Sequence, residues 1–240
     1  MRKDIGYYKA KLKNKETELE ILREIAETIS YNWDLQKVLS SIIGVVQGYS
    51  KSDSCFIYLV EDDHVVLAAS QNPHREMLGK ITLRRGEGIT GWVAEHKRTV
   101  ALESQAYEDE RFKFFNALPE DRFEAFLSLP IVFKDKVVGV INIQYRRKRK
   151  FVREKVRFLE IIARQVGGAI ENARLITETG VLKQTLETRK IVEKAKGIIM
   201  KRQGLSEAEA QKLLHKKSMD NRKSLREVAE AVILSEEIAR

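Results

Sequence analysis

The sequence predicts an α+β fold in which one antiparallel sheet is flanked by helices, with an N-terminal helix before it and a C-terminal coiled coil and three-helix bundle after it. Two observations support this prediction. Short β-rich runs separated by turn residues occupy the middle of the chain, whereas apolar residues at spacings of three and four dominate both ends. We therefore divide the chain into an N-terminal helix or coiled coil (1–30), a sheet domain (31–176), and a connecting helix with a basic bundle (177–240).

The composition limits the class of protein. Charged residues make up 33% of the 240 residues, and the formal net charge is +9. No apolar run approaches the ~18 residues of a membrane-spanning helix, and the polar N-terminus does not resemble a secretory signal. Cys55 is the single cysteine, which excludes an intrachain disulfide and a multi-cysteine zinc site. We expect a soluble, cytoplasmic protein that does not associate with a membrane.

The first thirty residues predict a long amphipathic helix. Its apolar side is a heptad seam interrupted by one lysine, formed by Ile5, Tyr8, Leu12, Lys15, Leu19, Leu22, Ala26, Ile29 and Trp33. The regular spacing favours a coiled coil or an interchain helix bundle, and the alternative is a helix that packs on its own domain. Further apolar residues at 35–46 predict a second, buried helix.

The middle of the chain predicts two antiparallel hairpins. Residues 55–60 and 65–68 are β-rich runs separated by an acidic turn, and residues 126–133 and 137–144 repeat this pattern around a Lys-Asp-Lys turn. Between the hairpins, residues 85–93 are rich in glycine and predict a tight turn that leads into a helix. Their spacing does not match a nucleotide-binding loop.

A long helix is expected from Val152 onward. Its apolar seam at 159–176 is a second candidate for dimer contacts, and we favour it because Lys15 interrupts the first seam. Gly167 and Gly168 lie within it and cost about 1 kcal/mol each relative to alanine, which suggests close helix–helix approach. Gly180 is a candidate break or hinge before the basic segment.

The last quarter of the chain holds most of the net charge. From Lys183 to Arg226 there are thirteen basic and five acidic residues. Gly204 is the expected stop of a first helix, and Ser206 and Ser224 begin capping boxes for two more helices. Apolar residues at helical spacing in all three segments predict a three-helix bundle.

One face of the first bundle helix is basic. Lys190, Lys194, Gly197 and Lys201 follow one another at helical spacing. A lysine-rich solvated face, which is the alternative, normally interleaves acidic residues, and this stripe has none. The stripe therefore favours binding to a polyanion. A glycine within a helix is costly, so Gly197 suggests close approach of another backbone or of a ligand.

The sheet domain carries ordered motifs at 86–93, 109–112, 128–131, 138–141 and 163–175. Over residues 31–176 they resemble a GAF domain. This resemblance implies a sensory module, often dimeric, whose antiparallel sheet cups a small molecule or chromophore on one face. The sequence identifies neither the ligand nor any cofactor.

Catalysis is not expected. GAF enzymes that reduce methionine sulfoxide need several cysteines, and cyclic-nucleotide hydrolases need a clustered set of His and Asp metal ligands. This chain has one cysteine and four dispersed histidines, His64, His74, His96 and His215. We therefore predict no catalytic residues and no metal site.

The basic bundle carries motifs at 189–200, 204–210, 213–214, 219–220 and 225–229. They resemble the ANTAR domain, an RNA-binding antitermination module of bacterial response regulators. The resemblance implies binding to paired hairpins in nascent leader RNA, commonly as a dimer, so that a terminator does not form. The expected RNA contacts are Arg189, Lys190, Lys194, Lys196, Gly197, Lys201, Lys216, Arg222 and Lys223.

Together the two resemblances imply a signal-responsive, RNA-binding transcription antitermination regulator that acts as a homodimer. The alternative is a GAF-containing, DNA-binding transcriptional regulator that uses the same bundle. Both use basic helices, so composition does not separate them, whereas competition between hairpin RNA and duplex DNA does. A purely structural coiled-coil adaptor leaves the basic segment unexplained.

Overall fold

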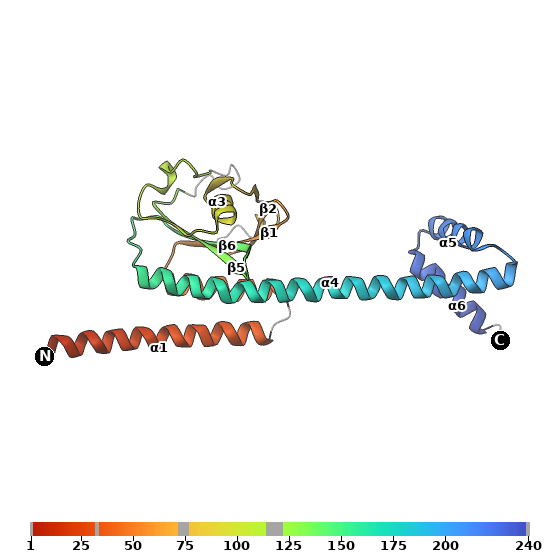
Figure 1. The fold of residues 1–240 in the computed structure, drawn as a ribbon, viewed down its shortest axis with the longest axis horizontal. Coiled ribbons are helices and arrows are strands. Elements are labelled where there is room, and N and C mark those ends of the chain that lie inside the picture. The colour runs from red at the N-terminus through yellow and green to blue at the C-terminus, as the bar shows by residue number, and fades with distance from the viewer. Residues whose placement is uncertain (1, 32–33, 72–76, 114–121, 239–240) are drawn as a thin grey trace. The chain divides into compact units, whose positions relative to one another are not determined.

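The computed structural model describes residues 2–31, 34–71, 77–113 and 122–238 (Figure 1). Two compact units divide the chain, Met1–Arg174 and Leu175–Arg240, so the N-terminal helix falls into the same unit as the sheet. Trp33 and His74, both used in the sequence predictions, lie outside the described residues. Within the described ranges, no helix combines the length and the apolar character needed to cross a bilayer.

The first unit contains a six-stranded antiparallel sheet in the order β3-β2-β1-β6-β5-β4. Its strands are β1 (Ser54–Glu61), β2 (His64–Ser70), β3 (Thr82–Arg84), β4 (Val100–Leu102), β5 (Ala125–Phe133) and β6 (Lys136–Tyr145). The two predicted hairpins are confirmed as β1–β2 and β5–β6. They join through the central pair, in which Tyr58 of β1 lies opposite Val140 of β6.

Helices cover both faces of this sheet. Successive residues of β1 alternate between the faces, so that Cys55 and Ile57 enter one apolar cluster while Phe56 and Tyr58 enter the other. Figure 1 shows α3 on one face and α4 on the other. The helices of this unit are α1 (Arg2–Tyr31), α2 (Leu35–Ser50), α3 (Gly88–His96), the short η2 (Ala106–Glu108) and the first part of α4 (Arg153–Gln203).

The two halves of α1 have different surroundings. In the second half, Ile25 is 1% exposed and belongs to the core, and Ile29 packs against it. Before Ile21, the seam residues Ile5, Leu12 and Leu19 are 52%, 61% and 66% exposed. The part of α1 from Ile21 onward therefore packs on its own domain, which is the alternative interpretation of the heptad seam.

The seam at 159–176 lies largely inside the domain. Leu159, Ile162 and Val166 are buried against the sheet within the same apolar cluster as α2. The part of this seam up to Ala169 is therefore covered by its own chain, which corrects the preference given to it as a dimer contact. At the end of this range, Leu175 and Ile176 are 50% and 45% exposed.

Two predictions about glycines in α4 are corrected. A Cβ atom on Gly167 would lie 2.6 Å from the carbonyl oxygen of Val132 in β5, so the close approach is between helix and strand rather than between two helices. A Cβ atom on Gly168 would meet nothing within 4 Å. Gly180 is helical and lies inside α4, so no helix break occurs there.

The second unit is the predicted three-helix bundle, formed by the last part of α4 with α5 (Glu207–Asn221) and α6 (Leu225–Ile238). Its small core contains Val192, Ala195, Ile199, Ala210, Leu214 and Ala229. These side chains come from all three helices, so each helix contributes one apolar face.

The helix ends in the bundle follow the sequence prediction. Gly204 ends α4 with a φ of +67°, and its N–H donates to the Met200 carbonyl at 2.9 Å. At the start of α5, the Ser206 hydroxyl oxygen accepts from the Glu209 N–H, and the Ser206 N–H donates to the Glu209 carboxylate at 2.9 Å. Ser224 forms the equivalent pair of bonds at the start of α6. Both capping boxes are confirmed.

Candidate nucleic-acid interface

The predicted basic stripe lies on the exposed side of α4 in the second unit. Lys190, Lys194, Gly197 and Lys201 are all exposed. Lys194 makes one loose ion pair, 3.3 Å from Glu237, in which both side chains are about 60% exposed. Such a pair is screened by solvent and is readily exchanged for another anion. Within the described ranges, Lys190 and Lys201 form no ion pair.

Gly197 has open space around it. A Cβ atom on this residue would meet nothing within 4 Å, in contrast to Gly167. Packing inside the bundle therefore does not require a glycine here. The exposed backbone at Gly197, with lysines on either side, is accessible to a ligand, as the sequence analysis expected.

Lys196 lies apart from the stripe. It is only 6% exposed, and its ammonium lies 2.8 Å from Glu193 on α4 and 2.8 Å from Glu207 at the start of α5. Hydrogen bonds to Glu193 and Glu207 raise the pKa of Lys196, and the bond from Lys196 lowers the pKa of Glu207. The ammonium is paired with one glutamate of its own helix and one of α5, so we reassign Lys196 from an RNA contact to a link between α4 and α5.

The spacing along α4 explains this placement. Lys196 is four residues after Val192 and three before Ile199, and both of these side chains are buried in the bundle core. The buried side of α4 follows Val192, Ala195 and Ile199, whereas Ile191 and Ile198 are only partly buried. This direction of the buried side turns Lys196 toward the core.

The turn between α5 and α6 contains two further residues that are predicted to contact RNA, Arg222 and Lys223. Arg222 has a left-handed backbone (φ 52°, ψ 38°), and its N–H donates to the Met219 carbonyl. The Lys223 N–H donates to the Ser218 carbonyl at 3.1 Å, and the Ser218 hydroxyl donates back to the Lys223 carbonyl at 2.6 Å. The turn is therefore ordered while both basic side chains remain exposed, as do Arg189 on α4 and Lys216 on α5.

A groove of about 470 Å³ lies among α4, α5 and α6. Its walls include the apolar side chains of Ile198, Leu213 and Val232, and its lining also includes the basic residues Arg202, Lys217 and Lys223. Arg202 and Lys217 are not among the contacts predicted from the sequence. Helical spacing could have found them, because Arg202 follows Ile198 by four residues and Lys217 follows Leu213 by four.

The first unit contains a buried chain of hydrogen bonds. The Ser128 hydroxyl donates to Asn142 Oδ1 at 2.7 Å, and Asn142 Nδ2 donates to the Thr90 hydroxyl at 2.7 Å. This chain fixes α3 to the centre of the sheet. Cys55 is fully buried, and burial raises the pKa of its thiol, so the reactive thiolate is suppressed. The described part of the chain contains no group of His, Cys, Asp and Glu side chains suited to a metal ion.

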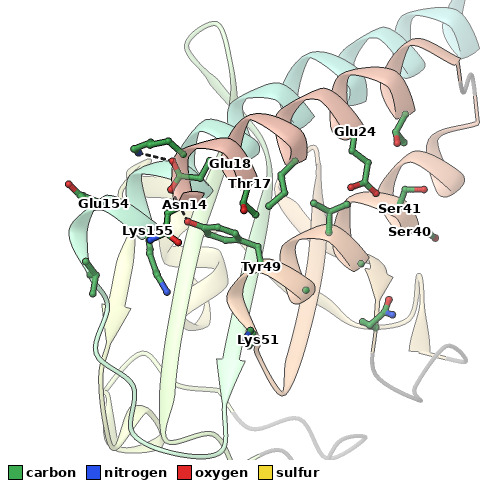
Figure 2. Close-up of a pocket in the computed structure, with 18 of the residues that line it drawn as sticks. Asn14, Thr17, Glu18, Glu24, Ser40, Ser41, Tyr49, Lys51, Glu154 and Lys155 are labelled. Atoms are coloured by element: carbon green, nitrogen blue, oxygen red, sulfur yellow. Dashed lines mark hydrogen bonds and ion pairs between the residues drawn. The ribbon is translucent and has the colours of Figure 1, made fainter. Parts of the chain in front are cut away.

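The first unit has a groove of about 950 Å³ between α1 and α2. Its α2 wall carries small residues, including Ser41, Gly44 and Gly48. Figure 2 shows Tyr49 reaching from α2 toward Glu18 on α1, and the Tyr49 hydroxyl donates to the Glu18 carboxylate at 3.1 Å.

The chain matches two family models. Residues 32–171, more than half of the chain, match the model described as a GAF domain. Residues 181–233 match the model described as an ANTAR domain.

Two relatives illustrate these similarities. The chain is 27% identical over 166 residues to a protein of the phosphoenolpyruvate-dependent phosphotransferase system of Escherichia coli (strain K12), a match that covers 68% of this chain and 22% of that protein. It is 39% identical over 69 residues to the transcriptional regulatory protein PdtaR of Mycobacterium tuberculosis (strain ATCC 25618 / H37Rv), covering 27% of this chain and 34% of PdtaR. The chain thus spans about a fifth and a third of the length of these two relatives.

Solved structures agree with the fold of the first unit. The GAF domain of an Acinetobacter phosphoenolpyruvate-protein phosphotransferase superposes with a TM-score of 0.61 and 26% identity. This match covers 67% of the present chain and 96% of that domain.

Proposed function

Because the chain belongs to the GAF domain family over residues 32–171 and contains an ANTAR domain at residues 181–233, we propose that it is a signal-responsive, RNA-binding regulator of transcription antitermination. In this proposal the basic bundle binds hairpins in nascent leader mRNA, and the GAF domain detects the signal. The similarity to a transcriptional regulatory protein supports a role in regulation. The proposal places the protein in the cytoplasm, where it meets nascent transcripts, and assigns it no reaction.

The observation that carries the proposal is the exposed stripe on α4. Lys190, Lys194 and Lys201 point their charges to solvent on one side of the helix, around the open backbone of Gly197. Exposed ammonium groups pay little desolvation cost when they meet phosphates, and binding releases counterions from the nucleic acid. A surface built in this way suits RNA phosphates at close range.

Hairpin RNA must be distinguished from duplex DNA, the alternative partner, because both are polyanions. In a competition titration, labelled hairpin RNA bound to the full chain is challenged with unlabelled hairpin RNA or with duplex DNA of matched length. We expect the RNA competitor to displace the label at much lower concentration than the DNA. Equal displacement by both would favour the DNA-binding alternative.

The signal is proposed to be a small molecule bound without a covalent bond on the α3 face of the sheet. The hydrogen-bond chain from Ser128 through Asn142 to Thr90 makes α3 a firm wall of that face. A bond through Cys55 is not expected, because its side chain is fully buried. Native mass spectrometry of the purified protein tests this proposal, since a bound ligand adds a mass that is lost on denaturation. A mass that survives denaturation would contradict it.

A homodimer is proposed because paired bundles would bind paired hairpins with a raised effective concentration. The exposed residues Ile5, Leu12 and Leu19 of α1 offer an apolar stripe to a second copy. The groove beside it has small residues on α2, which allow close approach of another helix (Figure 2).

Light scattering of the full chain tests this arrangement. We expect a mass of about twice 27.7 kDa at low micromolar concentration. Leu12→Glu and Leu19→Glu should shift the mass toward the monomer. Tyr31→Glu is the matched control, because Tyr31 is also exposed on α1 but lies off the stripe. A monomeric parent would overturn the proposal.

A further inference from the structure

We infer that the groove among α4, α5 and α6 receives one unpaired base of an RNA hairpin loop, while the basic side chains at its edges hold the neighbouring phosphates. This inference rests on the proposed RNA-binding function and adds a base-binding site to it. The groove has a volume of about 470 Å³, which lies in the range of small-ligand sites and accommodates a nucleotide base.

The walls of the groove suit the flat faces of a base. Ile198, Leu213 and Val232 come from three different helices and present aliphatic side chains to the same space. An unpaired base that leaves the stack of a loop gains from such contact, because its faces are removed from water. In the described lining no aromatic residue is present, so these aliphatic groups and the planar Arg202 guanidinium provide the contact.

Polar groups in the lining can address the edges of the base. Asn221 Nδ2 donates to the Lys217 carbonyl at 2.8 Å, which orients the side chain and leaves its Oδ1 as an acceptor. Gln203 and Ser235 also line the groove. A purely apolar groove for a protein helix does not need these groups, whereas loop bases are recognised through hydrogen bonds to their exposed edges.

The charge around the groove also favours an RNA base with its neighbouring phosphates. Lys217 and Lys223 line it, and neither forms an ion pair among the residues that the structure describes. Glu227 is the acidic residue of the lining, and its carboxylate accepts hydrogen bonds from Ser224. Arg202 also lines it and pairs with Glu236 at 3.1 Å. This positive rim complements the phosphates on either side of an inserted base.

The groove and the basic stripe belong to one surface of α4. Lys194 precedes Ile198 by four residues and Lys201 follows it by three, so both lie on the same side of the helix as this wall of the groove. A loop whose backbone follows the stripe therefore brings one of its bases to the groove. A continuous duplex has no unpaired base to insert, which makes the loop the distinguishing feature.

The test uses the full chain and a hairpin RNA selected from a library with one constant stem and a randomised loop. Each loop position is replaced in turn by an abasic nucleotide, and, in a second series, by fluorescent 2-aminopurine. We expect one position at which the abasic change weakens binding about ten-fold or more, as loss of a stacked base does. At that position, 2-aminopurine should change its fluorescence on binding.

A groove-filling variant connects this effect to the site. Ala231→Met adds volume inside the groove at an exposed position of α6, and Ala208→Met is the matched control at an exposed alanine outside it. Ala231→Met should bind the intact and the abasic hairpin with nearly equal affinity, whereas Ala208→Met should keep the parent's ten-fold preference. This non-additivity identifies a direct interaction between base and groove.

The outcomes separate the two proposals. If the parent binds hairpins but no loop position is sensitive, or if Ala231→Met keeps the preference, the base site is wrong while RNA binding stands. If the parent binds no hairpin RNA, the proposed function fails and this inference fails with it.

Discussion

Replacing Gly197 should raise the stability of the bundle and lower its affinity for RNA. The residue is exposed in the interior of α4, and a Cβ atom there would meet nothing within 4 Å. An alanine therefore carries no steric cost and gains the full difference in helix preference, about 1 kcal/mol. For a unit the size of Leu175–Arg240, this should raise its melting temperature by about 4–8 °C.

Binding should change in the opposite direction. A larger side chain at Gly197 covers the backbone between Lys194 and Lys201 and keeps an approaching phosphate away from it. We expect Gly197→Leu to weaken hairpin RNA binding about ten-fold, equivalent to ~1.4 kcal/mol, and Gly197→Ala to have a smaller effect.

The assay combines a thermal melt followed by circular dichroism with a titration of labelled hairpin RNA. Gly180→Ala is the matched control, because Gly180 is also exposed inside α4 with no neighbour within 4 Å of a Cβ atom. It should gain stability and keep the parent's RNA affinity. The reasoning is refuted if Gly197→Leu binds RNA as tightly as the parent, or if Gly197→Ala melts at a lower temperature than the parent.

Three further predictions follow from the contacts described. Lys201→Gln should flatten the slope of log K against log salt by about 0.7–0.9, measured by titration at several salt concentrations, and a slope equal to the parent's would remove Lys201 from the interface. Lys196→Gln should lower the melting temperature and leave that slope unchanged, because the Lys196 ammonium binds two glutamates. The pKa of Glu207 is lowered from its ordinary value of 4.5, so its pair with Lys196 stabilises the fold above pH 4.5 and loses this contribution as the pH falls. In melts at several pH values, a Glu207→Gln variant should show less of this acid sensitivity. Gly167→Val should destabilise the first unit by about 1–3 kcal/mol in urea unfolding, because its Cβ would clash with a strand carbonyl. Gly168→Val should destabilise it less, and equal losses of stability in the two variants would contradict the close helix–strand approach.

Local chemistry was readable from the sequence. The capping boxes at Ser206 and Ser224, the stop at Gly204 and the two hairpins all depend on residues within a few positions of one another. The position of the positive charge within the chain is likewise a property of the sequence. For these features, the pattern alone predicted the structure that is observed.

Contacts between distant segments were not readable in the same way. Helical spacing shows that two residues share a face, but the direction of that face depends on which segment covers it. The seam at 159–176 could have met a second copy, and the sheet covers most of it instead. Gly167 could have met a helix, and it meets Val132 of β5.

The candidate RNA-binding site shows both parts of this division. The sequence alone determined that a basic, three-helix bundle lies at the end of the chain and that Lys190, Lys194 and Lys201 share a face. Only the tertiary structure decided that Lys196 turns inward to Glu193 and Glu207, and that a groove rimmed by Lys217 opens beside the stripe. The physical reason is that burial and the shape of a groove are set by side chains from three separate helices, and no single helix encodes how the other two pack against it.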